Sequence, residues 1–348
     1  MKRLNRFTRT ALIVSVSLVA ISACSSDDNS ASTTTAAAAD STPTTIGPPA
    51  TTASSSSSPV TAASTVDSSG ESSTFSVEAA NGTVSLEAKA MKIVSLSPTH
   101  TEMLFAIGAG DQVIAVDDQS NFPAEAAAVQ TDLSGYTPNV EAIAGYKPDL
   151  VVIADDSSGL SEQLAGVNIP VWSGASAVSF DDVYTQLEQL GVLTGHIADA
   201  AGVVAGMQSD IADLTAKVPA TEVPLTYYHE LDTTYFSVTS DTFIGQIYAL
   251  AGLQNIADQA NATSSYPQLS SELIVSANPD LIFLADTKYG GSVATVVARD
   301  GWAGIAAVVN GNVIEMDDDI ASRWGPRVVD YFAAVVEAVQ SASIVAPA

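Results

Sequence analysis

Basic side chains and cysteine are scarce in this sequence. Among 348 residues there are 12 lysines and arginines against 39 aspartates and glutamates, which gives a formal net charge of −27 at pH 7, and there is one cysteine. Because phosphates are bound by clustered cations, this balance argues against a nucleic-acid partner. A lone cysteine can form neither an internal disulfide nor a metal site with several thiolates.

The sequence also lacks the short motifs that identify common enzymes. It contains no G-x-S-x-G, no H-E-x-x-H and no phosphate-binding loop. Adjacent acids, such as Asp117 beside Asp118, could be imagined as acid/base pairs. Neighbouring residues of a strand point to opposite faces, however, and so rarely act on one atom. These acids are therefore expected on a solvated surface. We therefore expect no enzymatic activity and no cofactor. A surface-anchored hydrolase that uses acidic loop residues is the alternative from another class.

The first residues have the pattern of a secretory signal peptide, predicted at residues 1–23. Four basic residues within the first nine precede an apolar run at residues 11–21, which is too short for a comfortable membrane span of about 20 residues. The only cysteine, Cys24, follows Ile21-Ser22-Ala23, which resembles the lipobox of bacterial lipoproteins. The resemblance implies that Cys24 is lipidated and anchors an extracytoplasmic protein to the cell membrane. An ordinary signal peptide with a chance cysteine is the alternative.

Residues 24–90 are predicted to be a disordered tether, in which the composition of residues 76–90 is ambiguous. More than half of residues 25–75 are Ser or Thr, and neither Lys nor Arg occurs between Arg9 and Lys89. Such a composition cannot bury enough apolar surface to offset the entropy of ordering the chain. A glycosylated stalk would serve the same purpose.

From about residue 91 onward, short apolar runs alternate with helical patterns. Runs typical of buried strands lie at residues 92–96, 113–116, 150–153 and 169–172, and helical patterns lie at residues 101–107 and 180–193. Strands separated by helices predict parallel α/β layers.

The same plan recurs 131 residues later. Glu141 lies seven residues before Pro148, and Glu272 lies seven residues before Pro279; each proline opens a Pro-Asp pair that leads into an apolar run. This recurrence predicts two lobes of related design, at residues 91–195 and 220–348. Residues 196–219 have helical spacing and no internal proline before Pro219. We therefore predict two α/β lobes joined by a single long bridging helix, with the ligand cleft between the lobes.

Four segments resemble the iron-chelate and vitamin-B12 class of ABC-importer solute-binding proteins. They are Ile-Val-Ser-Leu-Ser-Pro-Thr-His-Thr-Glu at residues 93–102, Pro-Asp-Leu-Val at 148–151 with Glu141 before it, Tyr-Pro-Gln-Leu-Ser-Ser-Glu at 266–272, and Arg-Trp-Gly-Pro-Arg at 323–327. The resemblance covers about residues 91–345. It implies a monomeric receptor that captures a ferric siderophore or cobalamin and delivers it to a permease dimer with ATPase subunits. It also implies that Glu141 and Glu272, one per lobe, dock onto permease arginines.

Ligand contacts are expected where loops border the cleft. The candidates are Ser97, Pro98, Thr99, His100, Tyr136, Tyr266, Tyr289, Arg323 and Trp324. A planar cation beside an aromatic ring suits an anionic, partly aromatic chelate. The alternative is that Arg323 pairs with one of the acids at 317–319 and that Trp324 is partly buried. Arg327 is expected to be structural.

Departures from the vitamin-B12-binding pattern leave the ligand open. Gln119 replaces a rim aromatic, a tryptophan expected near Tyr136 is absent, and Tyr266 stands where a cleft tryptophan is expected. Corrinoid, ferric siderophore and haem remain possible ligands.

Histidines suggest a separate alternative. His100, His196 and His229 are the only three in the chain, and three histidines with a carboxylate would suit a free Zn²⁺ ion. His196 is expected at the start of the bridging helix, away from the cleft, so no metal site is predicted.

Overall fold

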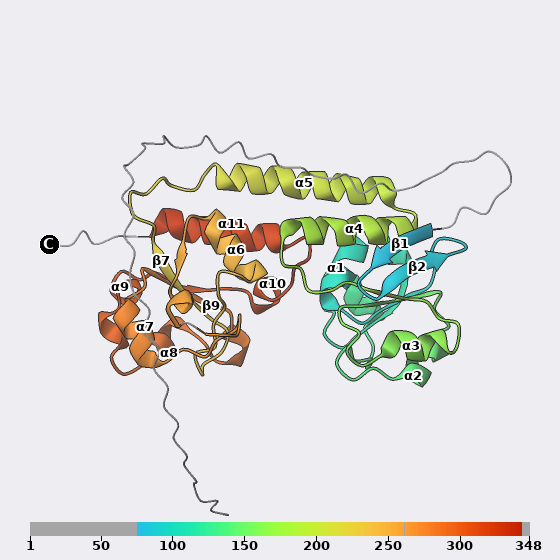
Figure 1. Ribbon diagram of the computed structural model, residues 1–348, viewed down its shortest axis with the longest axis horizontal. Helices are drawn as coiled ribbons and strands as arrows, with labels where there is room; N and C mark the ends of the chain where they lie inside the picture. The colour runs from blue at the N-terminus through green and yellow to red at the C-terminus, as the bar shows by residue number, and fades with distance from the viewer. Residues whose placement is uncertain (1–74, 261, 343–348) are drawn as a thin grey trace, which may run out of the picture. The chain divides into compact units, whose positions relative to one another are not determined.

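The computed structural model describes residues 75–260 and 262–342. Within them, the N-terminal lobe, which is coloured cyan to green in Figure 1, contains a parallel sheet. Its strands are β3 (Ile93–Ser95), β4 (Val113–Val116), β5 (Leu150–Ile153) and β6 (Val171–Ser173), in the order β4-β3-β5-β6. Every residue of β3, β5 and β6 is buried. Burial on both faces explains why these strands are continuous apolar runs in the sequence.

The C-terminal lobe repeats this sheet. Its parallel strands are β7 (Thr226–Glu230), β8 (Gln254–Asn255), β9 (Leu281–Leu284) and β10 (Val313–Glu315), in the order β8-β7-β9-β10. The first strand of each lobe is flanked by the second and third, and the fourth lies outside the third. The predicted fold of two α/β lobes with the same plan is confirmed.

Helices connect and cover the strands of the N-terminal lobe. They are α1 (Pro98–Ala106), α2 (Val140–Gly145), α3 (Leu160–Ala165) and α4 (Phe180–Thr194), with 3₁₀ turns η1 (Gly110–Gln112) and η2 (Ala126–Val129). Side-chain caps set several starts: Ser97 caps α1, and Ser179 with Asp182 forms a capping box at α4.

The C-terminal lobe contains a second set of helices. They are α6 (Phe243–Leu250), α7 (Ser271–Ala277), α8 (Val293–Val297), α9 (Ala306–Val309), α10 (Asp318–Ala321) and α11 (Val328–Ser341), with 3₁₀ turns η3 (Ile256–Ala260), η4 (Thr287–Tyr289) and η5 (Trp302–Gly304).

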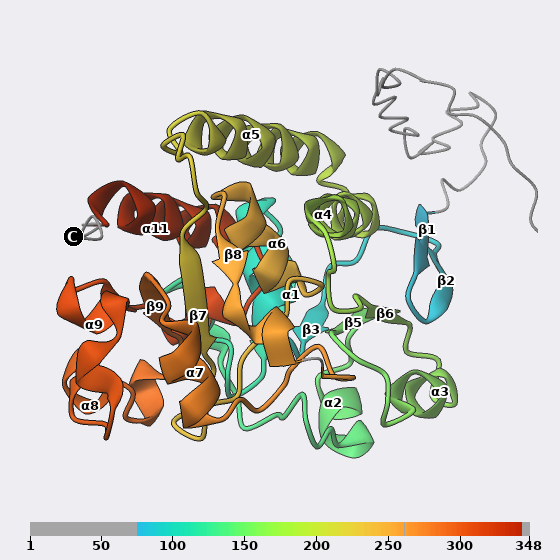
Figure 2. The same cartoon turned by 60° about the vertical axis from the view of Figure 1, so that its left-hand side comes forward.

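The helix predicted between the lobes is α5 (Ile197–Thr215). Gly195, with a left-handed φ of 79°, ends α4 and lets the chain reverse into α5. Helix α5 lies along α4 and α11, as Figures 1 and 2 show. No helix in the described part of the chain is both long and apolar enough to cross a membrane.

One apolar core includes side chains of both lobes. Leu187 and Leu190 of α4 belong to the same buried cluster as Tyr227 of β7, Phe283 of β9 and Phe332 of α11. Two smaller clusters lie within single lobes, around β5 in the first and around β9 in the second.

The C-terminal boundary predicted for the tether, residue 90, lies after two strands that the structure describes. Residues 75–86 form an antiparallel hairpin of β1 (Phe75–Ala79) and β2 (Gly82–Leu86), whose Val84 and Leu86 are buried in the shared core. Asn81 at the turn bonds the Val171 carbonyl and the Ser173 amide, which covers the outer edge of β6. The prediction of a tether is therefore wrong for residues 75–90, because alternating apolar residues there find a surface to cover. The predicted signal peptide, Cys24 and the remaining tether lie outside the described residues.

Candidate functional site

The candidate ligand residues follow the carboxyl ends of parallel strands. Ser97 and Pro98 follow β3, Tyr136 lies between β4 and α2, and Tyr266 lies between β8 and α7. Tyr289 lies in η4, after β9. Open α/β sheets bind ligands outside the carboxyl ends of their strands, so these loops are where a ligand site is expected.

The three loop tyrosines are exposed. Tyr136 is 87% exposed, Tyr266 is 52% exposed and Tyr289 is 81% exposed. The first two have the same local geometry: the Tyr136 amide donates to Ser134 Oγ at 3.2 Å, and the Tyr266 amide donates to Ser264 Oγ at 3.1 Å. The two lobes thus present an aromatic ring from matching loops.

Ser97, Thr99 and His100 are buried, and Pro98 is half-buried. His100 bonds Ser97 Oγ through Nδ1 at 2.8 Å and Gln186 Oε1 through Nε2 at 2.9 Å. Burial lowers the pKa of His100 to about 4, so its ring is neutral at pH 7. In this structure His100 joins α1 to α4 instead of facing an open surface.

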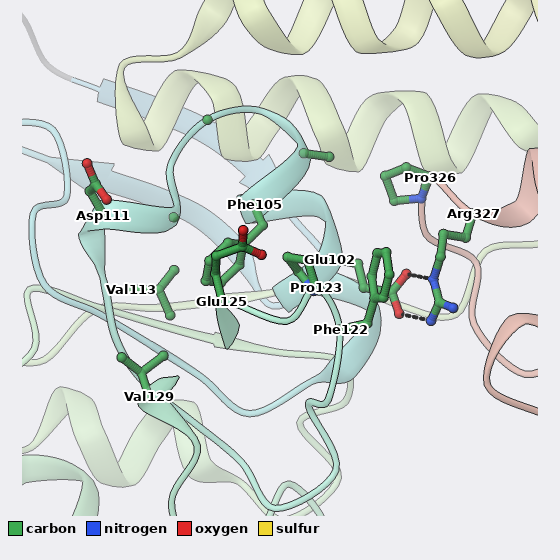
Figure 3. A pocket seen from close by; sticks show the side chains of 13 residues that line it. Glu102, Phe105, Asp111, Val113, Phe122, Pro123, Glu125, Val129, Pro326 and Arg327 are labelled. Atoms are coloured by element: carbon green, nitrogen blue, oxygen red, sulfur yellow. Dashed lines mark hydrogen bonds and ion pairs between the residues drawn. The ribbon is translucent and has the colours of Figure 1, made fainter. Parts of the chain in front are cut away.

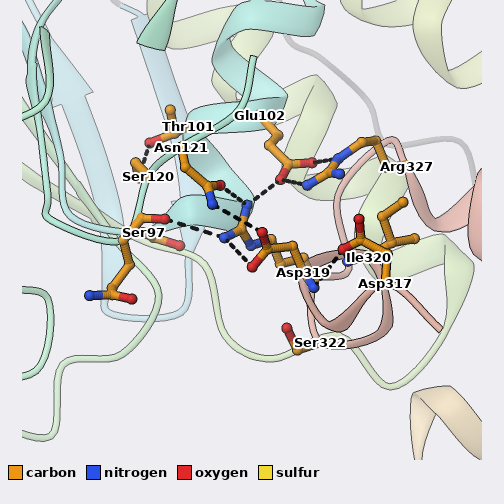
Figure 4. A network of polar contacts seen from close by, with 12 residues as sticks. Ser97, Thr101, Glu102, Ser120, Asn121, Asp317, Asp319, Ile320, Ser322 and Arg327 are labelled. Atoms are coloured by element: carbon orange, nitrogen blue, oxygen red, sulfur yellow. Dashed lines mark hydrogen bonds and ion pairs between the residues drawn. The ribbon is translucent and has the colours of Figure 1, made fainter. Parts of the chain in front are cut away.

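Arg323 is saturated by partners from both lobes. It donates to Glu102 Oε1 at 2.8 Å, to Asn121 Oδ1 at 2.9 Å, to the Gln119 carbonyl at 3.2 Å and to Asp319 Oδ1 at 2.9 Å. Figure 4 labels three of these partners, Glu102, Asn121 and Asp319. The Arg323 side chain is only 9% exposed. The pairing with Asp319 follows the alternative drawn from the sequence.

Trp324 is partly buried and donates from Nε1 to Gln186 Oε1 at 3.1 Å. Its ring lies edge-on to His100, with the ring centroids 6.0 Å apart. Gln186 therefore accepts from Trp324 and also contacts His100, which ties the segment after α10 to the N-terminal lobe.

Arg327 has the structural role expected of it. Its guanidinium donates twice to Glu102 and lies 4.1 Å from the centroid of the Phe122 ring. The hydrogen bonds that Arg327 donates to the Glu102 carboxylate raise the pKa of Arg327 above its ordinary value. Arg327, Glu102 and Phe122 also line a groove of about 730 Å³ along the edge of the N-terminal lobe. Its apolar walls include Phe105, Pro123, Val129 and Pro326 (Figure 3).

Glu102 is the residue that sequence reasoning missed. It is 3% exposed and accepts hydrogen bonds from both arginines. Two features could have indicated it: Glu102 is the only acid in α1, and it is the last residue of the 93–102 segment that resembles the family.

The three histidines lie in separate places. His229 of β7 is fully buried, bonds Tyr248 through Nδ1 at 2.9 Å, and has its pKa lowered to about 3 by burial. His196 precedes α5 and contacts Asp199. Among the described residues, no group of three His, Cys, Asp or Glu side chains could hold a metal ion.

Glu141 and Glu272 occupy equivalent positions. Each is the second residue of a short helix, α2 or α7, and each is exposed. Asn139 caps the first helix and Ser270 the second, each by accepting from the amide three residues later. Each lobe therefore presents a carboxylate at the same place.

Comparison with known proteins agrees with this architecture. Residues 93–320 match the family described as periplasmic binding protein. Over 271 residues the chain is 31% identical to the uncharacterized ABC transporter substrate-binding lipoprotein YvrC of Bacillus subtilis, which covers 75% of this chain and 84% of that one. Over 276 residues it is 32% identical to a cobalamin-binding protein of Halobacterium salinarum, covering 77% of this chain and 74% of that one.

A solved structure is also similar. The periplasmic heme-binding protein HutB of Vibrio cholerae superposes with a TM-score of 0.63 at 25% identity, covering 71% of this chain and 98% of that one. The family match spans both lobes and the helix α5 between them. The chain therefore belongs to the periplasmic binding protein family.

Proposed function

We propose that this protein is the lipid-anchored, extracytoplasmic substrate-binding protein of an ABC importer and that its ligand is a corrinoid. The observation that carries the proposal is the pair of matching loops that expose Tyr136 and Tyr266 on the two lobes. Aromatic rings supply a large contact area at little cost in side-chain entropy, which suits a broad macrocycle held between two lobes. The relative named as cobalamin-binding supports the same ligand class.

Charge narrows the class of ligand. Within the described residues after 217, every Lys and Arg is paired with an acid: Lys288 with Asp319, Arg299 with Glu230, and both Arg323 and Arg327 with Glu102. A polyanionic ferric chelate would therefore have to break an existing ion pair to find a cation in the C-terminal lobe. A corrinoid can be held mainly through its apolar and amide surface.

Haem is the second candidate. The phenol of a tyrosine can ligate ferric haem iron, and the proposed contacts Tyr136, Tyr266 and Tyr289 are all exposed. The similarity to HutB, which is named as heme-binding, favours this alternative over a free metal ion.

Delivery would use the two lobes symmetrically. Glu141 and Glu272 would each meet an arginine of the permease in a charge-assisted pair, and Cys24 would hold the protein at the membrane. The protein itself would bind and release its ligand without chemistry, and ATP hydrolysis would occur on partner subunits.

Titration of the purified protein tests the ligand. Cyanocobalamin, ferric hydroxamate chelate and haemin are added separately, and binding is followed by calorimetry and by the absorption spectrum of each ligand. We expect saturable binding of cyanocobalamin at micromolar or lower concentration. Binding of haemin alone would replace the corrinoid with the haem alternative, and binding of none would refute the proposal.

A further inference from the structure

A buried carboxyl group without a partner lies just after β9. Asp286 is fully buried, and neither Oδ1 nor Oδ2 has a hydrogen-bond partner. Buried polar groups in proteins are nearly always hydrogen-bonded, and a bare charge is the most costly exception. Burying the carboxyl group at this position therefore costs much less free energy when it is protonated than when it is ionised.

The charged groups around Asp286 do not supply a counter-ion. Glu230 at the end of β7, Asp318 in α10 and the Tyr228 phenol face it, together with the Arg299 guanidinium. Arg299 donates to Glu230 through Nη1 at 2.5 Å and Nη2 at 2.6 Å, so its charge is already matched. Burial first, and then the Glu230 charge, raise the pKa of Asp286 to about 6.

The backbone after Asp286 turns around its carboxyl group. The Asp286 carbonyl accepts from the Tyr289 amide at 2.8 Å and from the Gly291 amide at 3.1 Å. Gly291 passes so close to the carboxyl group that a Cβ at this position would collide with both of its oxygens. The Asp286 carboxyl group therefore packs against Gly291, and its position constrains the turn that carries Tyr289.

The start of the same loop is fixed independently. Asp318 Oδ1 accepts from the Thr287 amide at 3.0 Å, and Asp318 Oδ2 accepts from the Lys288 amide at 2.7 Å. The Asp286 carbonyl shares a planar peptide unit with the Thr287 amide and therefore stays in place with it. The Asp286 side chain can move separately: because Gly291 lies against the carboxyl group, turning this group toward water would displace Gly291 and break the bonds that the Gly291 and Tyr289 amides make to the carbonyl.

We propose that residues 286–291 form a proton-operated latch, in which neutral Asp286 holds the loop against the C-terminal sheet and ionised Asp286 turns toward water and releases Tyr289 and Gly291. The direction follows from the surroundings, because an ionised Asp286 is repelled by Glu230 and finds no free cation. The role of Tyr289 as a ligand contact rests on the proposed function, whereas the movement of the loop does not.

Amide hydrogen exchange tests the latch without any ligand. The full chain, labelled with ¹⁵N, is compared at pH 5 and pH 7.5 by NMR, with exchange rates corrected for their intrinsic dependence on pH. We expect the protection of the Tyr289 and Gly291 amides to fall about tenfold or more at the higher pH. The Thr287 and Lys288 amides serve as internal references and keep their protection. Equal protection of Tyr289 and Gly291 at both pH values would overturn the proposal.

Two substitutions separate the charge from the shape. Asp286→Asn keeps the size and removes the charge, so the loop should stay protected at both pH values. Gly291→Ala places a methyl group where the carboxyl group lies, so protection should be low at both. Asp300→Asn, which removes an exposed carboxylate of the same lobe, is the matched control and should keep the pH dependence of the wild type. Persistent pH dependence in Asp286→Asn would refute the role of Asp286.

A titration of the unmodified protein guards against variants that fail to fold. The ¹³C shift of the Asp286 carboxyl group should titrate with a midpoint near 6, and a midpoint near 4 would refute the latch. The affinity for cyanocobalamin should fall between pH 5 and 7.5 in the wild type and stay constant in Asp286→Asn. A working latch in a protein that binds none of the tested chelates would refute only the proposed function.

Discussion

Arg327 at the start of α11 and Glu102 in α1 join the two lobes through two hydrogen bonds. Arg327 Nε lies 2.8 Å from Glu102 Oε2, and Arg327 Nη2 lies 2.5 Å from Glu102 Oε1. Arg323 adds a third bond to the same carboxylate. Because Glu102 is almost fully buried, its ion pairs with these two cations offset the cost of burying a carboxylate.

Removing this charge should destabilise the protein strongly. Glu102→Gln leaves two partly buried guanidinium groups without their main counter-ion, and we expect the free energy of unfolding to fall by about 3 kcal/mol. Urea denaturation at pH 7 measures the change. Glu125→Gln, which alters an exposed acid in the wall of the same groove, should change it by less than about 0.5 kcal/mol. Equal effects of the two variants would contradict a stabilising role for the pair.

Acidification should destabilise the protein through its buried histidines. The pKa of His100 is about 4 and that of His229 about 3 in the folded protein, against 6.5 in the unfolded chain. Below pH 6.5 the unfolded chain therefore binds more protons, and stability falls as pH decreases by up to about 1.4 kcal/mol per pH unit for each histidine. Asp286 acts in the opposite direction between about pH 4 and 6, because its raised pKa makes the folded state bind the extra proton.

The variant His100→Gln isolates one of these contributions. Gln stays neutral, so at pH 5 the variant should take up about one proton fewer than the wild type when it unfolds. Denaturation curves at pH 5 and pH 8 measure the difference, since both states of His100 are neutral at the higher pH. An unchanged pH slope in the variant would show that His100 does not contribute.

Loss of the rim aromatics should weaken ligand binding. Tyr136→Ala and Tyr266→Ala should each reduce affinity by about tenfold or more, because each removes a large apolar surface from the interface. Calorimetric titration with the ligand that binds the wild type measures the effect. Tyr146→Ala is the control and should bind normally, because Tyr146 follows α2 and precedes the amino end of β5, whereas the ligand loops follow the carboxyl ends of strands. Normal binding by both rim variants would place the site elsewhere.

Charge reversal should abolish docking and spare the fold. Glu141→Arg together with Glu272→Arg should prevent uptake by cells, while ligand binding by the isolated protein stays near that of the wild type. The loss of two favourable helix-end charges should cost only about 1 kcal/mol of stability. Glu162→Arg, an exposed acid in the first turn of α3, should leave uptake unchanged. Normal uptake by the double variant would refute the docking role.

Replacing the single cysteine should release the protein from the membrane. Cys24→Ala removes the only position that can carry the lipid, so the protein should be recovered unprocessed or in the soluble fraction. Mass spectrometry of the wild-type N-terminus is the complementary measurement. An unmodified, soluble wild-type protein would show that the anchor does not exist.

Much of the fold could be predicted because short stretches of the sequence have the residue patterns of the elements they form. The buried strand β5 is a run of four apolar residues, and α4 begins at a Ser-x-x-Asp capping box. The recurrence of Glu141 and Glu272 before Pro-Asp pairs predicted two related lobes. The hairpin of residues 75–86 was missed because a Ser/Thr-rich segment gives way to it gradually. Its apolar residues are buried by packing on the shared core beside α4, and its turn bonds the edge of β6; neither partner is visible in the local sequence.

The site could be predicted only in part, because its decisive contacts are distant in sequence. Glu102 bonds Arg323, which is 221 residues away, and Arg327, which is 225 residues away. No local sequence pattern indicates that these two arginines bind the Glu102 carboxylate and not a ligand. The unpartnered carboxyl group of Asp286 depends in the same way on burial beneath a loop, which composition and spacing do not reveal.

The apolar core that both lobes share has a consequence for how the protein unfolds. Helix α4 of the first lobe and α11 of the second contribute to one buried cluster, with α5 packed against both. Separating the lobes would expose that cluster to water, at a cost that rises with each apolar side chain uncovered. The described region should therefore melt in one cooperative transition, and a proteolytic nick between α4 and α5 should not liberate an independently folded half.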